Sequence, residues 1–226
     1  MEKYISKKEK ASYGFAAVGS YMVAGITQSY LMYFFTDILI IPSAFVMMLM
    51  IVARVWDALN DPMMGVIVDR TSTKYGKMRP YVLVGSFLML FTTIVLFMPL
   101  TGAPTMFKMI FAAVSYIIFG MAYTLTDVPA MGLMSVATPN SDERASLLSF
   151  YVTVGSVGSL LPVGLLTIFQ SFIPEKYVYF AMSIFVGIIT SAAYLTLFKN
   201  SKERFSTHTE KIAVRDMIKA AGKNNP

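Results

Sequence analysis

The segment ARVWDALNDPMMG, residues 53–65, places three charged side chains inside a run of apolar residues. PSAFVMMLMIV (residues 42–52) precedes it and VIV (residues 66–68) follows it, so the whole run has the length and character of a helix that crosses a membrane. The 226-residue chain is 56% hydrophobic and 14% charged, whereas soluble domains carry roughly 25% charged residues. The sequence therefore predicts an integral membrane protein.

Apolar runs of this kind recur along the chain, and short connections rich in turn residues join them. They predict an all-α membrane protein, a bundle of six transmembrane helices within residues 1–198. After residue 198 the composition becomes strongly charged, which predicts a cytoplasmic linker over residues 199–226 with a short amphipathic helix. The expected spans cover about residues 12–36, 43–68, 80–100, 107–136, 147–172 and 177–198.

The basic residues predict the orientation of this bundle. Of the 19 Lys and Arg residues, 16 fall at the amino terminus, in the second and fourth connections, or after residue 198. The opposite side has only Lys108 and Lys176. Because basic residues accumulate on the cytoplasmic side, both termini are expected there. The net charge of +6 then follows from topology and does not indicate nucleic-acid binding, and the absence of cysteine excludes disulfides.

The charges of the second span share one face of its helix. Successive residues are 100° apart, so Arg54, Asp57 and Asp61 fall, with Gly65, within an arc of about 80°. A charge at bilayer depth costs at least about 2.5–3.5 kcal/mol, and such groups usually face a bundle interior or a watery cavity. An Arg54–Asp57 pair could be purely structural, but one arginine cannot also neutralise Asp61. The pattern favours an ion or substrate path.

Another carboxylate, Asp127, lies in the fourth span within AYTLTDVPAMG, residues 122–132. Asp61 and Asp127 each lie about 18 residues past the expected outer ends of spans that run in the same direction, so we expect them at similar depth. Thr124, one turn before Asp127, adds a hydroxyl. Carboxylate, amide and hydroxyl oxygens suit a hard cation such as Na⁺ or Li⁺. The residues expected to donate oxygen ligands to this cation are Asp57, Asn60, Asp61 and Thr124. Asp57 and Asp61 are the charged ligands among them.

At these motifs the chain resembles the glycoside–pentoside–hexuronide:cation symporters, a branch of the major facilitator superfamily. The matching motifs, in the family's order and spacing, are SYGF (12–15), YLMYFFTD (30–37), ARVWDALNDPMMG (53–65), GKMRP (76–80) and YTLTDVP (123–129). Family members have twelve spans in two six-helix bundles with the substrate site between them. The resemblance covers essentially this whole chain and implies the N-terminal half of that fold, in the cytoplasmic (inner) membrane of a bacterium.

The resemblance implies cation-coupled symport of a sugar or glycoside by alternating access, with Na⁺ or H⁺ as the coupling cation, no other cofactor and no enzymatic activity. It implies that the donors named above bind the cation and that Asp127 accepts sugar hydroxyls. The residues expected to contact substrate are Asp127, Tyr21, Gln28 and Met131. Those expected in gating and packing are Arg54, Gly65, Asp69 and Arg70.

The chain departs from the galactoside-transporting members of that family at several substrate positions. Those members carry Lys-Asp in the first span, where this chain has Ser20 and Tyr21. They carry tryptophan where it has Met131, and arginine in the fifth span where it has Val152. The cation site is therefore kept while much of the galactoside site is not. The expected substrate is a glycoside, pentoside or hexuronide of another shape.

Two alternatives stay open at this point. The chain could be a truncated, non-transporting half, because an alternating-access site needs either the missing C-terminal six-helix half or a second copy to close against. The carboxylates Asp57, Asp61 and Asp127 also outnumber the one arginine in the spans. An intramembrane aspartyl protease is the other alternative. Asp57 and Asp61 share a helix, however, and the GxGD motif of those enzymes is absent.

Overall fold

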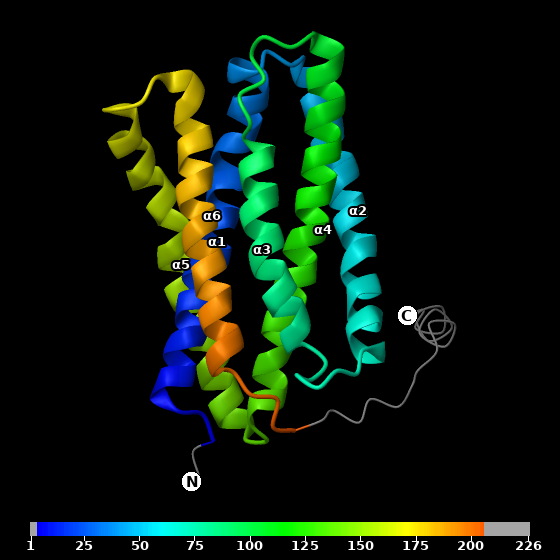
Figure 1. The fold of residues 1–226 in the computed structure, drawn as a ribbon, viewed down its shortest axis with the longest axis vertical. Helices are drawn as coiled ribbons and strands as arrows, with labels where there is room; N and C mark the ends of the chain where they lie inside the picture. Colours follow the sequence, from blue (N-terminus) through cyan, green and yellow to red (C-terminus); the bar gives the residue numbers. More distant parts are fainter. Residues whose placement is uncertain (1–3, 206–226) are drawn as a thin grey trace, which may run out of the picture.

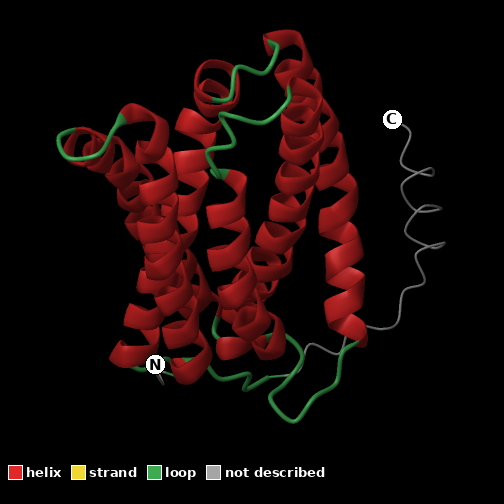
Figure 2. Ribbon diagram, turned by 45° about the horizontal axis from the view of Figure 1, so that its top comes forward, coloured by secondary structure: helices red, strands yellow, loops and turns green. Residues whose placement is uncertain are grey.

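The structure is a computed structural model that describes residues 4–205. Long helices run alongside one another, and short loops join them (Figure 2). The start of α1 and the end of α6 lie at the same end of the bundle (Figure 1). In chain order the described elements are α1 (Lys7–Tyr33), the π-helical turn η1 (Phe34–Ile38), α2 (Ser43–Arg70), α3 (Arg79–Leu96), α4 (Thr105–Ala137), α5 (Ser141–Gln170) and α6 (Glu175–Asn200).

Helix α1 is covered on one side by two other helices of the bundle. It packs mainly against α5 and α6; α3 then packs between α6 and α4, and α2 packs on α4. Small residues allow the closest of these approaches: a Cβ added to Gly158 of α5 would lie 2.9 Å from the Val18 backbone of α1. Close packing through small residues is the usual way in which helices associate in lipid, where apolar burial gives little driving force.

Five described helices, α2 to α6, are long and apolar enough to cross a membrane. Helix α1 is not among them, although six spans were predicted. Its sequence mixes aliphatic residues with glycine, serine and tyrosine, and many of these, such as Tyr13 and Ser20, are fully buried against neighbouring helices. A helix face that packs against protein can carry more polar residues than a face that contacts lipid. The predicted all-helical membrane fold is confirmed, while the sixth span stays a prediction.

Helices α1 and α5 begin about five residues earlier than the apolar runs that predicted them, because both have charged first turns. Helix α1 begins at residue 7, where the Ser6 hydroxyl accepts a 3.1 Å hydrogen bond from the backbone N–H of Glu9. Helix α5 begins at residue 141, where the Asn140 side chain accepts a 2.9 Å bond from the N–H of Asp142. Both are ordinary N-caps, which satisfy N–H groups that lack a partner in the first turn.

The opposite end of α1 has a feature that the sequence did not predict. The chain continues into η1, and the carbonyl of Leu39 then accepts a 2.5 Å hydrogen bond from the ammonium of Lys108. Lys108 is only 6% exposed. A cation at the C-terminal end of a helix satisfies a free carbonyl and complements the helix dipole. Lys108, predicted only as a basic residue at the outer end of the fourth span, is therefore a buried cap.

Residues 201–205, directly after α6, are tied to the bundle, whereas a linker was expected from residue 199. The guanidinium of Arg204 donates to both carboxylate oxygens of Glu9 in α1, at 2.8 and 2.7 Å. This hydrogen bonding raises the pKa of Arg204 above its ordinary value. The backbone N–H of Arg204 also donates to the carbonyl of Val136 at the end of α4. The amphipathic helix predicted for the linker lies outside the described residues.

The same segment caps helix α3. The Glu203 carboxylate accepts hydrogen bonds of 2.8, 2.9 and 3.0 Å from the backbone N–H groups of Lys77, Met78 and Arg79. An anion is favoured at this helix end because unpaired N–H groups and the positive end of the dipole meet there. Gly76, immediately before them, has a φ of +107°, and a Cβ on it would collide with the Glu203 carboxylate. Only glycine fits both the conformation and the space.

Replacing Gly76 with alanine should lower the stability of the folded chain by about 1–3 kcal/mol, because the backbone conformation becomes strained and the carboxylate is displaced. Thermal unfolding in detergent would measure the effect. Gly102→Ala is the matched control, since a Cβ there meets nothing within 4 Å, and should stay within about 0.5 kcal/mol. Equal melting temperatures for the two variants would contradict the role given to this turn.

Candidate functional site

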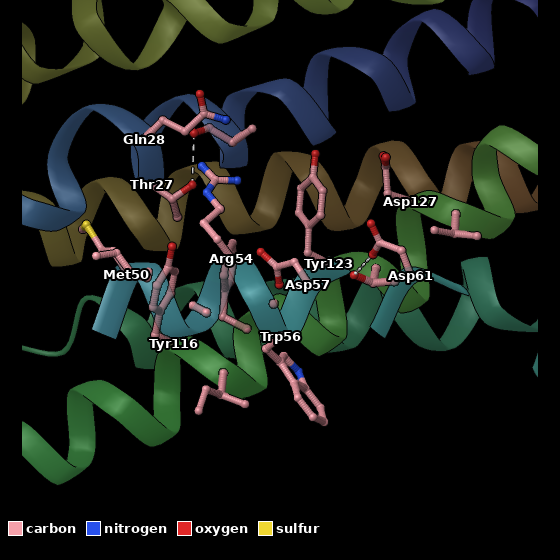
Figure 3. Close-up of a pocket in the computed structure, with 18 residues that line it drawn as sticks. Thr27, Gln28, Met50, Arg54, Trp56, Asp57, Asp61, Tyr116, Tyr123 and Asp127 are labelled. Atoms are coloured by element: carbon pink, nitrogen blue, oxygen red, sulfur yellow. Dashed lines mark hydrogen bonds between the residues drawn. The ribbon is translucent and has the colours of Figure 1, made fainter. Parts of the chain in front are cut away.

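A cavity of about 690 Å³ opens between α1, α2 and α4 (Figure 3). Its size falls within the roughly 300–1,000 Å³ typical of small-molecule sites. One guanidinium and several carboxylates face it together with hydroxyl, amide and apolar groups. The polar and charged lining residues are Thr27, Gln28, Arg54, Asp57, Asp61, Tyr116, Tyr123, Thr124 and Asp127.

Helix α2 supplies three of the charges. Arg54, Asp57 and Asp61 line the cavity together, as their helical spacing predicts. The pair that could have made Arg54 purely structural is not formed, because the only ion pair within 4.0 Å among residues 4–205 joins Arg204 and Glu9. Helix α2 continues through Pro62 without a break. The carbonyl of Ala58 nevertheless has no N–H to accept at residue 62, because proline carries none.

The predicted cation donors are partly brought together. The Thr124 hydroxyl of α4 donates a 2.8 Å hydrogen bond to Oδ1 of Asp61, which joins α4 to α2, and Asp57 lines the same cavity. Asn60 is buried beside them but does not line the cavity, and its amide makes no hydrogen bond with the described residues. No group of three or more acidic or histidine side chains in residues 4–205 is arranged to hold a metal ion. A cation here would depend on neutral oxygens as well as carboxylates.

Asp127 is held by hydroxyls from three different helices. Its Oδ1 accepts a 2.8 Å hydrogen bond from Ser20 in α1, a 3.4 Å bond from Tyr151 in α5 and a 3.3 Å bond from Tyr194 in α6. Ser20 also lies 3.1 Å from the Tyr123 hydroxyl. The second oxygen, Oδ2, makes no hydrogen bond with the described residues. Asp127 is thus fixed through one oxygen while the other stays available to a ligand.

These three supporting hydroxyls were not predicted as site residues. Ser20 entered the sequence analysis only as a departure from the galactoside pattern, and Tyr151 and Tyr194 did not enter it. Each is 1% exposed or less. A buried tyrosine in an apolar span is a usable signal, since its hydroxyl needs a partner. The identity of that partner requires the packing of the helices.

The other predicted substrate residues divide into two groups. Gln28 lines the cavity with Asp127. Tyr21 does not, because its ring packs edge-on against Tyr151, with centroids 6.2 Å apart. Met131 is 42% exposed and also lies outside the cavity lining. Its expected contact with substrate, like that of Tyr21, stays a prediction.

Of the four predicted gating residues, Arg54 lines the cavity, whereas Gly65, Asp69 and Arg70 lie beyond it, toward the end of α2 where the chain turns to α3. A Cβ added to Gly65 would meet nothing within 4 Å. Asp69 and Arg70 are exposed at the last turn of α2 and form no ion pair with other described residues. Their position allows contact with another structural unit.

Comparison with known proteins adds an independent observation. Residues 12–226 match the family model described as MFS/sugar transport protein. The chain is 32% identical to the protein named Uncharacterized symporter YjmB of Bacillus subtilis, over all of this chain and 50% of that protein. It is 30% identical to Inner membrane symporter YicJ of Escherichia coli, over 98% and 48%, and 31% identical to Putative glycoside/cation symporter YagG of the same species, over 89% and 44%. The chain spans about half the length of these relatives.

Proposed function

Because this chain belongs to the MFS/sugar transport protein family, we propose that it provides the cation-binding and sugar-binding half of a cation-coupled symporter. The observation that carries the proposal is one cavity in which Thr124 is hydrogen-bonded to Asp61 while Asp127 faces the same space. Cation and sugar would then occupy neighbouring positions. The cation would raise the affinity for the sugar, and thermodynamic linkage then requires the sugar to raise the affinity for the cation by the same factor.

The cation is proposed to sit at the carboxylates of α2. Asp57 and Asp61 would supply charge, and the Thr124 hydroxyl would supply a neutral oxygen held in place by its bond to Asp61. Rotation of the Asn60 side chain would add an amide oxygen, since this amide has no competing hydrogen bond. Na⁺ suits such an all-oxygen set, and H⁺ is the alternative, because protonation of one carboxylate would remove the same charge.

The sugar is proposed to bind next to the cation, through Asp127. Oδ2 of this carboxylate would accept hydroxyls of the substrate while Ser20, Tyr151 and Tyr194 hold Oδ1. Gln28 lines the same cavity and would add amide contacts to the ring or its substituents. A carboxylate fixed by three helices is preorganised, so little ordering is lost when substrate binds.

A second six-helix bundle is proposed to close this cavity. All of its lining comes from α1, α2 and α4. Helices α2 and α5 also expose rows of apolar side chains, for example Val55, Leu59, Val157 and Leu160. The second bundle would be the other half of a longer protein like the relatives, or a second copy of this chain. Alternating access would arise as the two bundles rock about the site, with α1 as the sixth span and both termini in the cytoplasm of a bacterium.

The alternative of an intramembrane aspartyl protease has less support. The relatives are named as symporters, and the family is one of transport proteins. A protease also needs two carboxylates that share one water. Here Oδ1 of Asp127 is held by three hydroxyls and Oδ1 of Asp61 by Thr124.

Binding of sugars to the full 226-residue chain in lipid nanodiscs tests the proposal. We expect at least one sugar or sugar acid to bind about 5- to 150-fold more tightly when Na⁺ replaces choline or when the pH is lowered. The same chain, as a monomer in proteoliposomes, should not accumulate that sugar, because nothing closes the cavity. Sugar affinity that changes with neither Na⁺ nor pH would refute the coupling. Accumulation of the sugar by a monomer would refute the need for a second bundle.

A further inference from the structure

The end of the bundle at which α3 begins and α6 ends carries a surplus of basic side chains. The end of α2 with the turn before α3 (residues 69–79) and the end of α6 (residues 198–203) together contain six Lys and Arg residues against two acids, Asp69 and Glu203. Glu203 is engaged internally, because its carboxylate accepts hydrogen bonds from three backbone N–H groups at the start of α3. None of the six basic residues forms an ion pair with residues 4–205. This surface therefore presents positive charge that the described part of the chain does not neutralise.

Aromatic rings hold this basic surface together, where the turn before α3 meets the end of α6 (Figure 1). The Tyr75 ring meets Phe198 edge-on, with centroids 6.0 Å apart, and the Arg79 guanidinium lies 4.9 Å from the centroid of the Phe198 ring. Arg79 also donates a 2.7 Å hydrogen bond to the carbonyl of Phe198. The ammonium of Lys74 lies 5.0 Å from the centroid of the Tyr75 ring. These four residues and Lys199 form what we call the α3–α6 patch, in which Lys74, Tyr75 and Lys199 are exposed.

An exposed apolar stripe of α6 leads to this patch. Phe185 and Ile188 are exposed on α6. Lys199 follows Ile188 by eleven residues, which is within about 20° of three full turns and about 16 Å further along the axis. Lys199 thus lies on the same face as the apolar stripe, and Phe87 and Phe91 are exposed on the neighbouring α3. Because 16 Å is about half of the roughly 30 Å hydrocarbon core, the patch reaches headgroup level when Ile188 lies near the middle of the bilayer.

The position of this face favours lipid over the proposed second bundle as its neighbour. The cavity that the second bundle would close is lined by α1, α2 and α4, and no residue of α3 or α6 lines it. The apolar rows proposed to meet the second bundle lie on α2 and α5. Helices α3 and α6 instead pack on each other and expose large apolar side chains elsewhere. In the cytoplasmic leaflet, where this end of the bundle is predicted to lie, anionic lipids attract basic side chains by about fivefold for each Lys or Arg near the surface.

We propose that the α3–α6 patch binds the headgroup of an anionic phospholipid of the cytoplasmic leaflet, with the acyl chains along the apolar faces of α3 and α6. The ammonium groups of Lys74 and Lys199 contact the phosphate as compact charges on flexible stems. The exposed Tyr75 ring lies at the interface, where tyrosine is enriched in membrane proteins. A zwitterionic lipid binds less tightly because its headgroup carries no net charge. The lipid site shares no residue with the proposed cation and sugar sites.

Native mass spectrometry of the full chain in detergent, titrated with phosphatidylglycerol or with phosphatidylcholine of the same acyl chains, tests this site. The native chain should bind its first phosphatidylglycerol at least about tenfold more tightly than phosphatidylcholine, at about fivefold for each lysine of the patch. Lys74→Gln combined with Lys199→Gln should weaken phosphatidylglycerol binding about 25-fold on the same scale and leave phosphatidylcholine within about twofold. Lys74→Arg combined with Lys199→Arg should keep the native affinity within about threefold, because both charges remain.

Lys7→Gln combined with Lys8→Gln is the matched control. It removes two exposed lysines from the start of α1, outside the patch, and should leave the affinity for both lipids within about twofold. An equal loss of phosphatidylglycerol binding in the two Gln pairs would overturn the site, because general attraction to an anionic surface would then explain the result. Equal affinity of the native chain for the two lipids, or release of phosphatidylglycerol by inorganic phosphate, would also overturn it.

Discussion

Replacing Asp61 with asparagine should abolish the effect of the coupling cation on sugar binding, so that the affinity ratio with and without Na⁺ falls close to one. Asp61 lies on the cavity face of α2, and Thr124 holds one of its oxygens from α4. Asparagine keeps the size and the hydrogen bond but removes the charge to which a cation responds. The lost coupling corresponds to about 1–3 kcal/mol, the usual range for linked sites.

The Asp61→Asn result is informative only if sugar binding itself survives. We expect the affinity measured without Na⁺ to change little, because Oδ2 of Asp127 still faces the cavity. Asp142→Asn, at the first turn of α5 and outside the cavity, is the control that removes a carboxylate without touching the site. Full Na⁺ dependence in Asp61→Asn would place the cation elsewhere and remove the main role given to α2.

Replacing Asp127 with asparagine should weaken sugar binding about tenfold to a hundredfold at every Na⁺ concentration, because hydroxyls of the substrate lose a charged acceptor. Three hydroxyls hold Oδ1 of Asp127 in the native chain, and the amide can keep several of these contacts. The fold should therefore persist, which helical circular dichroism and the elution volume would check. Equilibrium binding of the best sugar ligand is the measurement.

The Tyr194→Phe variant distinguishes the positioning of Asp127 from its direct contact with the sugar. It removes one 3.3 Å hydrogen bond to Oδ1 and leaves Oδ2 and the charge in place. We expect its effect on sugar affinity to stay below about tenfold, smaller than that of Asp127→Asn. Two results would contradict this assignment: normal sugar affinity in Asp127→Asn, or a loss of sugar binding in that variant only when Na⁺ is absent. Asp127 would then belong to the cation site and not to the sugar site.

The features that follow from local sequence patterns could be predicted. Helical periodicity alone put Arg54, Asp57 and Asp61 on one face of α2, and equal depth put Asp127 near them; all four line one cavity. Helix ends were less accurate because charged first turns such as Lys7–Lys10 of α1 do not look apolar. Family membership was also predictable, because the motifs are specific, and the comparison confirms it.

The features that depend on contacts between distant segments could not be predicted. Tyr151 and Tyr194 reach Asp127 from two other helices, and only the packing of α5 and α6 around α1 brings them there. Glu203 caps α3 across more than a hundred residues of chain. Lys108 was expected only as a basic residue at the outer end of the fourth span, whereas its side chain is buried and its ammonium donates to the carbonyl of Leu39. Each of these groups is satisfied by a partner far away in the sequence.

The most direct test of the central claim is a cation titration read by tryptophan fluorescence. Trp56 is the single tryptophan of the chain, lines the cavity and precedes Asp57. At constant ionic strength and pH, Na⁺ should produce a saturable change that K⁺ and choline do not, and lower pH should shift the curve to higher Na⁺ because protons compete for the same carboxylates. The change should disappear in Asp61→Asn. An identical Na⁺ response in that variant, or no response of the native chain to either Na⁺ or acid, would contradict a coupling-cation site in this bundle.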